Sequence, residues 1–291
     1  MLAVVIGLVG ALVYGTADFI GGVASKRIRA VRVTAISGAS GLVLLLVVYL
    51  FVGGVWSAKA VLLGALSGVS GSLGIMLLYA CLAIGPMSIL SPLTAVVSAL
   101  VPMLAGVIRG ERLQPIGYLA LGIALVAVVL VGFVPEKGVV RPSLRALAMA
   151  VASGTLIGIF LIVIDLTPTD SGAVPLLMNR AANATIMFAA VGVLALVARR
   201  RPGSGGNSGW RPGLVLAVAC GLVDASANAL LLLGLRLGEL TIQSVLTALY
   251  PAGTIVLAAI VLREKIAPVQ IVGLVLALGA AAMLSIAQVP A

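Results

Sequence analysis

The sequence predicts an all-α integral membrane protein with ten transmembrane helices, built as two inverted repeats of five helices. Composition is the first observation behind this prediction: 62% of the 291 residues are hydrophobic and only 9% are charged. Such a chain has too little polar surface to cover a soluble globule of this length. The lipid bilayer is therefore the expected surroundings of almost every helix.

Internal duplication is the second observation. Residues 85–115 align with residues 238–268 at a constant offset of 153, with eleven identical positions. Chance similarity between two stretches rich in Leu, Ala and Val would match only aliphatic positions, whereas here polar residues and helix breakers match too. These matches are Gly85/Gly238, Ser91/Ser244, Thr94/Thr247, Glu111/Glu264 and Pro115/Pro268.

Ten apolar stretches have the length of a membrane span, since a helix needs about 20 apolar residues to cross roughly 30 Å of hydrocarbon. They lie near residues 2–24, 33–52, 59–84, 87–108, 116–134, 143–165, 174–198, 213–237, 240–262 and 267–287.

The break PEKGVVRPS at 135–143 divides these spans into two sets of five. We therefore expect a first repeat over residues 1–138 and a second over 139–291. Five is an odd number, so the second repeat enters the membrane in the opposite orientation, as in many secondary transporters. The other long break, at 198–212, is too short for a folded domain, so we expect no soluble domain.

The net charge of +10 reflects membrane topology rather than a nucleic-acid partner, because the Lys and Arg residues lie in connectors beside spans. The connectors on one side carry 13 Lys and Arg residues, and those on the side of the two termini carry 4. The positive-inside rule then puts both termini outside the cytoplasm. We expect a multi-pass protein of a bacterial cytoplasmic (inner) membrane.

The run SVLTALYPAGTIVLAAIVLREKIAPVQIVGLVLALGAAAML closely resembles the signature of EamA-type transporters in the drug/metabolite transporter superfamily. The resemblance rests on Tyr250-Pro251, Thr254, Arg263-Glu264-Lys265, Gly273, Gly110-Glu111-Arg112 and Tyr14-Gly15. It implies a central cavity between the repeats and export of small metabolites by alternating access. Two departures stand out: such proteins are commonly drawn with cytoplasmic termini, and their arginine early in span two is replaced here by the Ser37-Gly38 region, while Arg180 keeps it in span seven.

Three ionisable residues lie well inside predicted spans: Asp18, Arg180 and Asp224. Each costs about 2.5 to 3.5 kcal/mol at a helix centre, so they should face one another or water. At 1.5 Å per residue, Asp224 is separated along the membrane normal by only about 5 Å from Arg180 and about 7 Å from Asp18. All three could share one cavity.

The functional interpretation is that Asp224 and Asn228, one helical turn apart, line a solute site, and that Asp18 or Asp224 exchanges a proton or another coupling ion for solute. Tyr14 lies one turn before Asp18. Thr247 and Tyr250 form a polar pair expected on one face of span nine. The structural interpretation is a static pair between Arg180 and Asp224 that only fixes helix packing.

The leading function is a secondary transporter of small solutes such as amino acids, amines or drug-like molecules, with no cofactor and no enzymatic activity. There is no phosphate-binding GxxxxGK[ST] motif and no histidine in the chain. A membrane-embedded enzyme acting on lipids or peptides, a gradient-independent facilitator and a passive scaffold are the alternatives. An enzyme would need a nucleophile with a base, or clustered carboxylates for a metal.

Other notable residues have a structural prediction. The glycine stripes of spans one and three are expected to pack helices closely, and the two cysteines to behave as small apolar residues. The acids near span ends are expected to cap helices or lie at the interface; they are Glu111, Asp165, Asp170, Glu239 and Glu264.

Overall fold

The computed structural model describes residues 1–25, 27–82, 87–132, 142–199, 211–261, 263 and 266–287, and these segments are almost entirely helical. The first repeat holds α1 (Leu2–Ser25), α2 (Ala30–Val52), α3 (Ala58–Leu82), α4 (Met87–Ile108) and α5 (Pro115–Gly132). The second holds α6 (Leu144–Asp165), α7 (Val174–Arg199), α8 (Leu214–Leu237), α9 (Leu240–Thr247), α10 (Tyr250–Val261) and α11 (Pro268–Ala287). The short 3₁₀ helices η1 (Thr169–Ser171) and η2 (Arg211–Gly213) lie in its connectors.

Familiar start and stop residues set the helix ends. Ser143 caps α6, because its hydroxyl accepts a hydrogen bond from the backbone N–H of Ala146 at 3.2 Å. Pro115 and Pro268 open α5 and α11, where the missing N–H of proline removes no helical hydrogen bond. Gly53 ends α2 with a φ of 66°, a conformation that favours glycine.

By length and composition, eight described helical segments can cross a membrane, and two shorter apolar helices, Leu93–Ile108 and Pro268–Leu284, accompany them. The eight include Leu240–Val261, which joins α9 and α10. The chain is therefore a multi-pass membrane protein, as its composition predicts.

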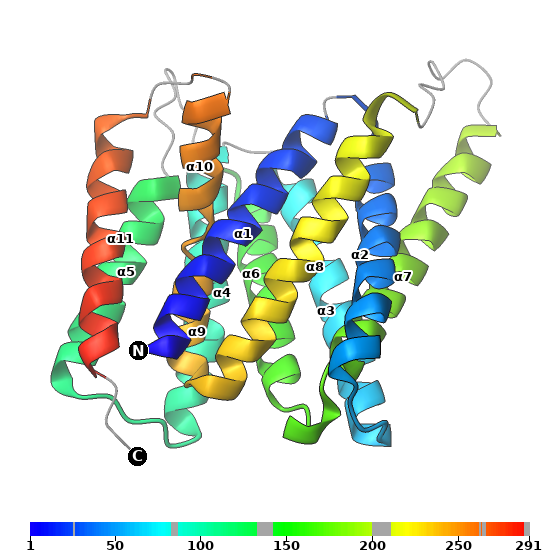
Figure 1. Cartoon of the computed structure of the whole chain (residues 1–291). Helices are drawn as coiled ribbons and strands as arrows, with labels where there is room; N and C mark the ends of the chain where they lie inside the picture. Colours follow the sequence, from blue (N-terminus) through cyan, green and yellow to red (C-terminus); the bar gives the residue numbers. More distant parts are fainter. Residues whose placement is uncertain are drawn as a thin grey trace.

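The two repeats run in opposite directions. In Figure 1, α1 starts at the end of the bundle where the N-terminus lies and α11 ends, whereas α6 starts at the opposite end. We call the first end the terminal end and the second the basic end. The chain segments at the basic end are the α1–α2 connector, the start of α6, η2 and the segment after α10, which carry Arg27, Arg29, Arg145, Arg211 and Arg263. The predicted boundary between residues 138 and 139 falls in 133–141, outside the described residues.

Helix contacts follow the duplication. α1 packs along α8, and α6, the counterpart of α1, packs along α3, the counterpart of α8. We call these contacts the α1–α8 seam and the α3–α6 seam. α5 packs on its counterpart in the second repeat, α11, and α2 packs on its counterpart, α7. Each of these two contacts is therefore unchanged when the repeats are exchanged. The framework of the bundle thus has an approximate two-fold symmetry.

The predicted packing role of the glycine stripes is confirmed. A Cβ atom on Gly68 of α3 would collide with the carbonyl oxygen of Asn179 on α7, and one on Gly15 of α1 would collide with that of Tyr250. Cys81 and Cys220 are free and buried, as predicted. Glu111 caps a helix as predicted, since it accepts from the first N–H groups of α9. Glu264 lies outside the described residues.

The predicted span 240–262 is not one continuous helix. It breaks after Thr247, and a new helix begins at Tyr250. Pro251 explains the break, because it has no N–H to donate to the carbonyl of Thr247 four residues earlier. The chain turns there through bonds from Ala248 to Ser244 and from Leu249 to Leu246. Thr247 therefore ends α9 and Tyr250 begins α10, so no single regular helix carries both residues, and their pairing at a site stays a prediction.

Candidate functional site

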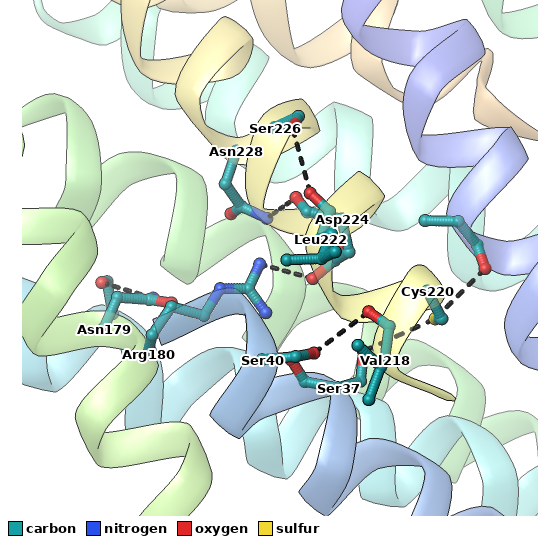
Figure 2. Close-up of polar contacts among 12 residues, drawn as sticks. Ser37, Ser40, Asn179, Arg180, Val218, Cys220, Leu222, Asp224, Ser226 and Asn228 are labelled. Carbon is teal, nitrogen blue, oxygen red and sulfur yellow. Dashed lines mark hydrogen bonds and ion pairs between the residues drawn. The ribbon is translucent and has the colours of Figure 1, made fainter. Parts of the chain in front are cut away.

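An ion pair joins α7 to α8 inside the bundle. Nη2 of Arg180 lies 2.5 Å from Oδ2 of Asp224. Figure 2 shows these two side chains pointing toward each other. The Arg180 side chain is only 8% exposed and that of Asp224 is 26% exposed. The two residues whose depths match in the sequence are thus brought together, and each charge has an opposite partner that offsets part of its desolvation.

Small residues make room for the guanidinium group. Gly41 of α2 lies against Cδ of Arg180, and a Cβ added there would lie 3.0 Å from the carbonyl oxygen of Gly221 on α8. Ser40 of α2 donates to the carbonyl of Val218 at 3.2 Å, which fixes α2 against α8 at the same level. α2 therefore contributes space and backbone contacts here, and not a charge of its own.

The first repeat supplies two further groups from α1. Tyr14 interacts electrostatically with Asp224, Arg180 and Asp18, and Asp18 interacts with Asp224. By surface area, the Asp18 side chain is exposed. Tyr14 and Asp18 thus lie within electrostatic range of the ion pair, and their sharing of one cavity with it stays a prediction.

Asn228 lies one turn after Asp224, but its amide is used within the helix. Its Nδ2 donates to the backbone carbonyl of Asp224 at 2.8 Å, and the residue is 4% exposed. The side chain of Asn228 is therefore held beside the ion pair by α8 itself, with part of its hydrogen-bonding capacity already satisfied.

Tyr250 contacts α1 next to this site. Its carbonyl lies against Gly15, between Tyr14 and Asp18 in sequence, and the Thr254 hydroxyl donates to the Gly15 carbonyl at 3.0 Å. Gly15 is therefore in direct contact with Tyr250 and Thr254, and all three residues belong to the motifs that carry the family resemblance. Thr247 is part-buried at the end of α9, and no hydrogen bond places it with the ion pair.

Sequence reasoning missed several polar residues around the ion pair. Asn183 follows Arg180 by three residues and faces Gly38 of α2, where a Cβ would lie 3.0 Å from its Oδ1. Asn179 donates to the Ser67 hydroxyl at 2.8 Å. Their spacing could have indicated this role, because polar residues at 179, 180 and 183 of an otherwise apolar helix lie on neighbouring faces.

Buried polar atoms without a hydrogen-bond partner gather at this site. Within the described part of the chain, five side-chain atoms are in this state, and three of them belong to Tyr14, Arg180 and Asn183. These are a hydroxyl, the Nε–H of the guanidinium group and an amide oxygen. Buried polar groups are nearly always paired, so their concentration indicates a place where water or a polar solute completes the bonds.

Cys220 lies between this cluster and α1. Its thiol donates to the carbonyl of Ala17 at 3.3 Å and accepts from Ser37 at 3.5 Å. Among the residues that the structure describes, no group of three His, Cys, Asp or Glu side chains is placed to hold a metal ion. The chemistry of the cluster is that of two carboxylates, one guanidinium group and neutral polar groups.

Comparison with known proteins gives the family. A crystal structure of a protein with 18% identical residues superposes with a TM-score of 0.70, covering 98% of this chain and 97% of that chain, which shows the same fold. No curated protein matches the chain. The pattern of the EamA-like transporter family matches residues 1–133 and again residues 144–286. The chain therefore belongs to the EamA-like transporter family, with one copy of its unit in each repeat.

Proposed function

We propose that this protein is a secondary transporter that exports small solutes across a bacterial cytoplasmic membrane by alternating access. α9 and α10 then form one interrupted span, which with the other nine long helices gives ten spans around a central cavity. The loop charges favour termini outside the cytoplasm, so the basic end would face the cytoplasm. The observation that carries the proposal is the cluster of Arg180, Asp224, Asp18 and Tyr14 deep within the bundle.

Charge supports the solute class. Two carboxylates beside one guanidinium group leave one negative charge unbalanced when both acids are ionised. A cationic or zwitterionic solute, such as an amine, an amino acid or a cationic drug-like molecule, would balance that charge. Its polar groups would also pair with the buried atoms of Tyr14, Arg180 and Asn183 that have no partner.

The same charge supports exchange with protons. A proton on Asp18 or Asp224 cancels the negative charge that attracts a cationic solute, so proton and solute compete for one site. Binding of either one displaces the other, and a proton gradient across the membrane then drives the solute in the opposite direction. If Asp18 takes the proton, Arg180 would hold the Asp224 carboxylate in place in both states.

The test is solute flux in proteoliposomes. A mixed pool of amines, amino acids and cationic drugs is supplied, and uptake and efflux are followed under an imposed pH gradient for wild type, Asp18→Asn and Asp224→Asn. We expect gradient-driven movement of at least one solute in wild type and its loss in at least one variant. Equal flux in all three, independent of the gradient, would instead support a facilitator in which Arg180 and Asp224 only pack helices. Absence of flux of every solute, with turnover of a lipid or peptide, would support an enzyme.

A further inference from the structure

We propose that a set of polar contacts between the two repeats latches the terminal end shut and must break before the pathway opens to that side. This terminal latch consists of three ties: Glu111 with the start of α9, Arg109 with Asp165, and the loop 53–55 with the loop 170–173. The proposal deepens the proposed function, on which it rests, by naming what closes one end of the transport path.

The first tie holds the N-terminus of α9. Oε1 of Glu111 accepts from the N–H of Leu240 at 3.0 Å, and Oε2 accepts from that of Thr241 at 2.8 Å. These N–H groups have no partner within their own helix, and a carboxylate is favoured beside a helix N-terminus. Glu111 belongs to the α4–α5 connector of the first repeat, so it caps a helix of the other repeat.

The approach of Glu111 depends on α4. A Cβ added to Gly106 would collide with Oε2 of Glu111 and with the hydroxyl of Thr241. That hydroxyl donates to the carbonyl of Met103, also on α4, at 3.2 Å. α4 and α9 are therefore joined through both the backbone and the side chain of Thr241.

The second tie is an ion pair. Nη1 of Arg109, after the end of α4, lies 2.6 Å from Oδ2 of Asp165, the last residue of α6. The Arg109 side chain is 44% exposed, so this pair contributes little stability by itself. Its position matters more, because it joins the same connector of the first repeat to a second helix of the other repeat.

The third tie joins two connectors through their backbones. Val55 donates to the carbonyl of Asp170 at 3.0 Å, and Ala173 donates to the carbonyl of Gly53 at 3.1 Å. Gly54 and Gly172 have φ values of 145° and 50°, and a Cβ on either would collide with the opposite loop. Only glycine allows this close approach, which again crosses from the first repeat to the second.

The three ties share two properties that suit a latch. Each crosses between repeats at the terminal end, so relative motion of the repeats breaks all of them together. Each is a polar contact near the end of the bundle, where water can replace it when it opens. α9 is itself short and ends at the break before Tyr250, so it can move without carrying α10 with it.

Hydrogen–deuterium exchange of the protein in lipid nanodiscs tests the latch without measuring transport. The variant Glu111→Gln keeps the size of the side chain and loses its charge. We expect the amides of Leu240 and Thr241 to exchange about fivefold faster or more. We also expect faster exchange at Val55 and Ala173, which do not contact Glu111. Asp165→Asn, which breaks a different tie, should produce the same spread toward α9.

Ser57→Ala is the matched control. The Ser57 hydroxyl accepts from the N–H of Ala60 at 3.1 Å, so its loss removes a helix cap at the same end but within one repeat. Its effect should stay within the first turn of α3. Faster exchange confined to the first turn of α9 in Glu111→Gln, with Val55 and Ala173 unchanged, would overturn the latch. A spread of exchange in a protein that moves no solute would instead keep the latch and reject the proposed transport.

Discussion

The α1–α8 seam and the α3–α6 seam occupy equivalent places in the two repeats but have different chemistry. Ser70 in the α3–α6 seam donates to the carbonyl of Leu156 at 2.6 Å, and Ser153 donates to that of Gly74 at 2.7 Å. These two hydroxyls each join one helix to the backbone of the other. The α1–α8 seam instead carries Asp18 and Asp224, with Arg180 alongside on α7. Duplication therefore explains the framework, and the proposed solute site lies where the repeats differ.

The largest expected effect comes from breaking the ion pair beside the α1–α8 seam. Arg180→Gln or Asp224→Asn alone leaves one charge without its partner, so each should lower the free energy of unfolding by about 3 kcal/mol. Thermal unfolding in detergent measures the loss. The double variant should recover most of that stability and still transport no solute.

A double variant with normal flux would contradict this account, because it would make the pair dispensable for transport. Stability that is unchanged in both single variants would also contradict it, since the two charges would then be independently hydrated.

A change in the α3–α6 seam should affect folding and not transport. A Cβ on Gly74 would lie 2.9 Å from Cγ1 of Ile157 and 3.2 Å from its backbone N, so Gly74→Val should lower stability by about 1–3 kcal/mol. Flux per folded molecule should match wild type. Gly71→Ala is the control, because the nearest atoms, those of Phe160, lie 3.8 Å away. Lost flux in folded Gly74→Val would show that this seam also takes part in transport.

The smallest expected effect is a pH dependence at the terminal end. Burial raises the pKa of Glu239, and the neighbouring Glu111 raises it further. The folded state therefore holds this proton more tightly than the unfolded chain. At acid pH, Glu239 therefore does not lower the free energy of unfolding. As pH rises through its folded-state pKa, the group does lower that free energy. Glu239→Gln should remove this fall in the midpoint of thermal unfolding. An identical pH profile in the variant would reject the assignment.

Much of the fold could be predicted from the sequence. Span lengths, the inverted order and the glycine packing follow from hydropathy, from an odd number of spans and from small residues at helical spacing. The depth of each charge also predicted the meeting of Arg180 with Asp224, because 1.5 Å per residue is fixed along any helix.

The remaining features depend on rotation and side-chain choice, which depth does not determine. Asn183 lies beside the ion pair because the rotation of α7 points its side chain toward Gly38 of α2. Asn228 instead bonds to its own helix, because the carbonyl of Asp224 lies one turn away. The break between Thr247 and Tyr250 lies where Pro251 removes a helical hydrogen bond, but the sequence alone does not determine whether a proline bends a helix or ends it. The terminal latch joins residues far apart in the sequence, such as Glu111 and Thr241, which are 130 positions apart, and Arg109 and Asp165, which are 56 apart. No local pattern predicts such pairs.

The most direct test of the central claim is proton release on solute binding. Purified protein in weakly buffered detergent is titrated with the solute that the flux assay identifies, and the pH is recorded. We predict that wild type and Gly74→Val release protons on binding, and that release is absent in Asp18→Asn or in Asp224→Asn. Binding without proton release in wild type, or equal release in both acid variants, would contradict competition between proton and solute at the α1–α8 seam.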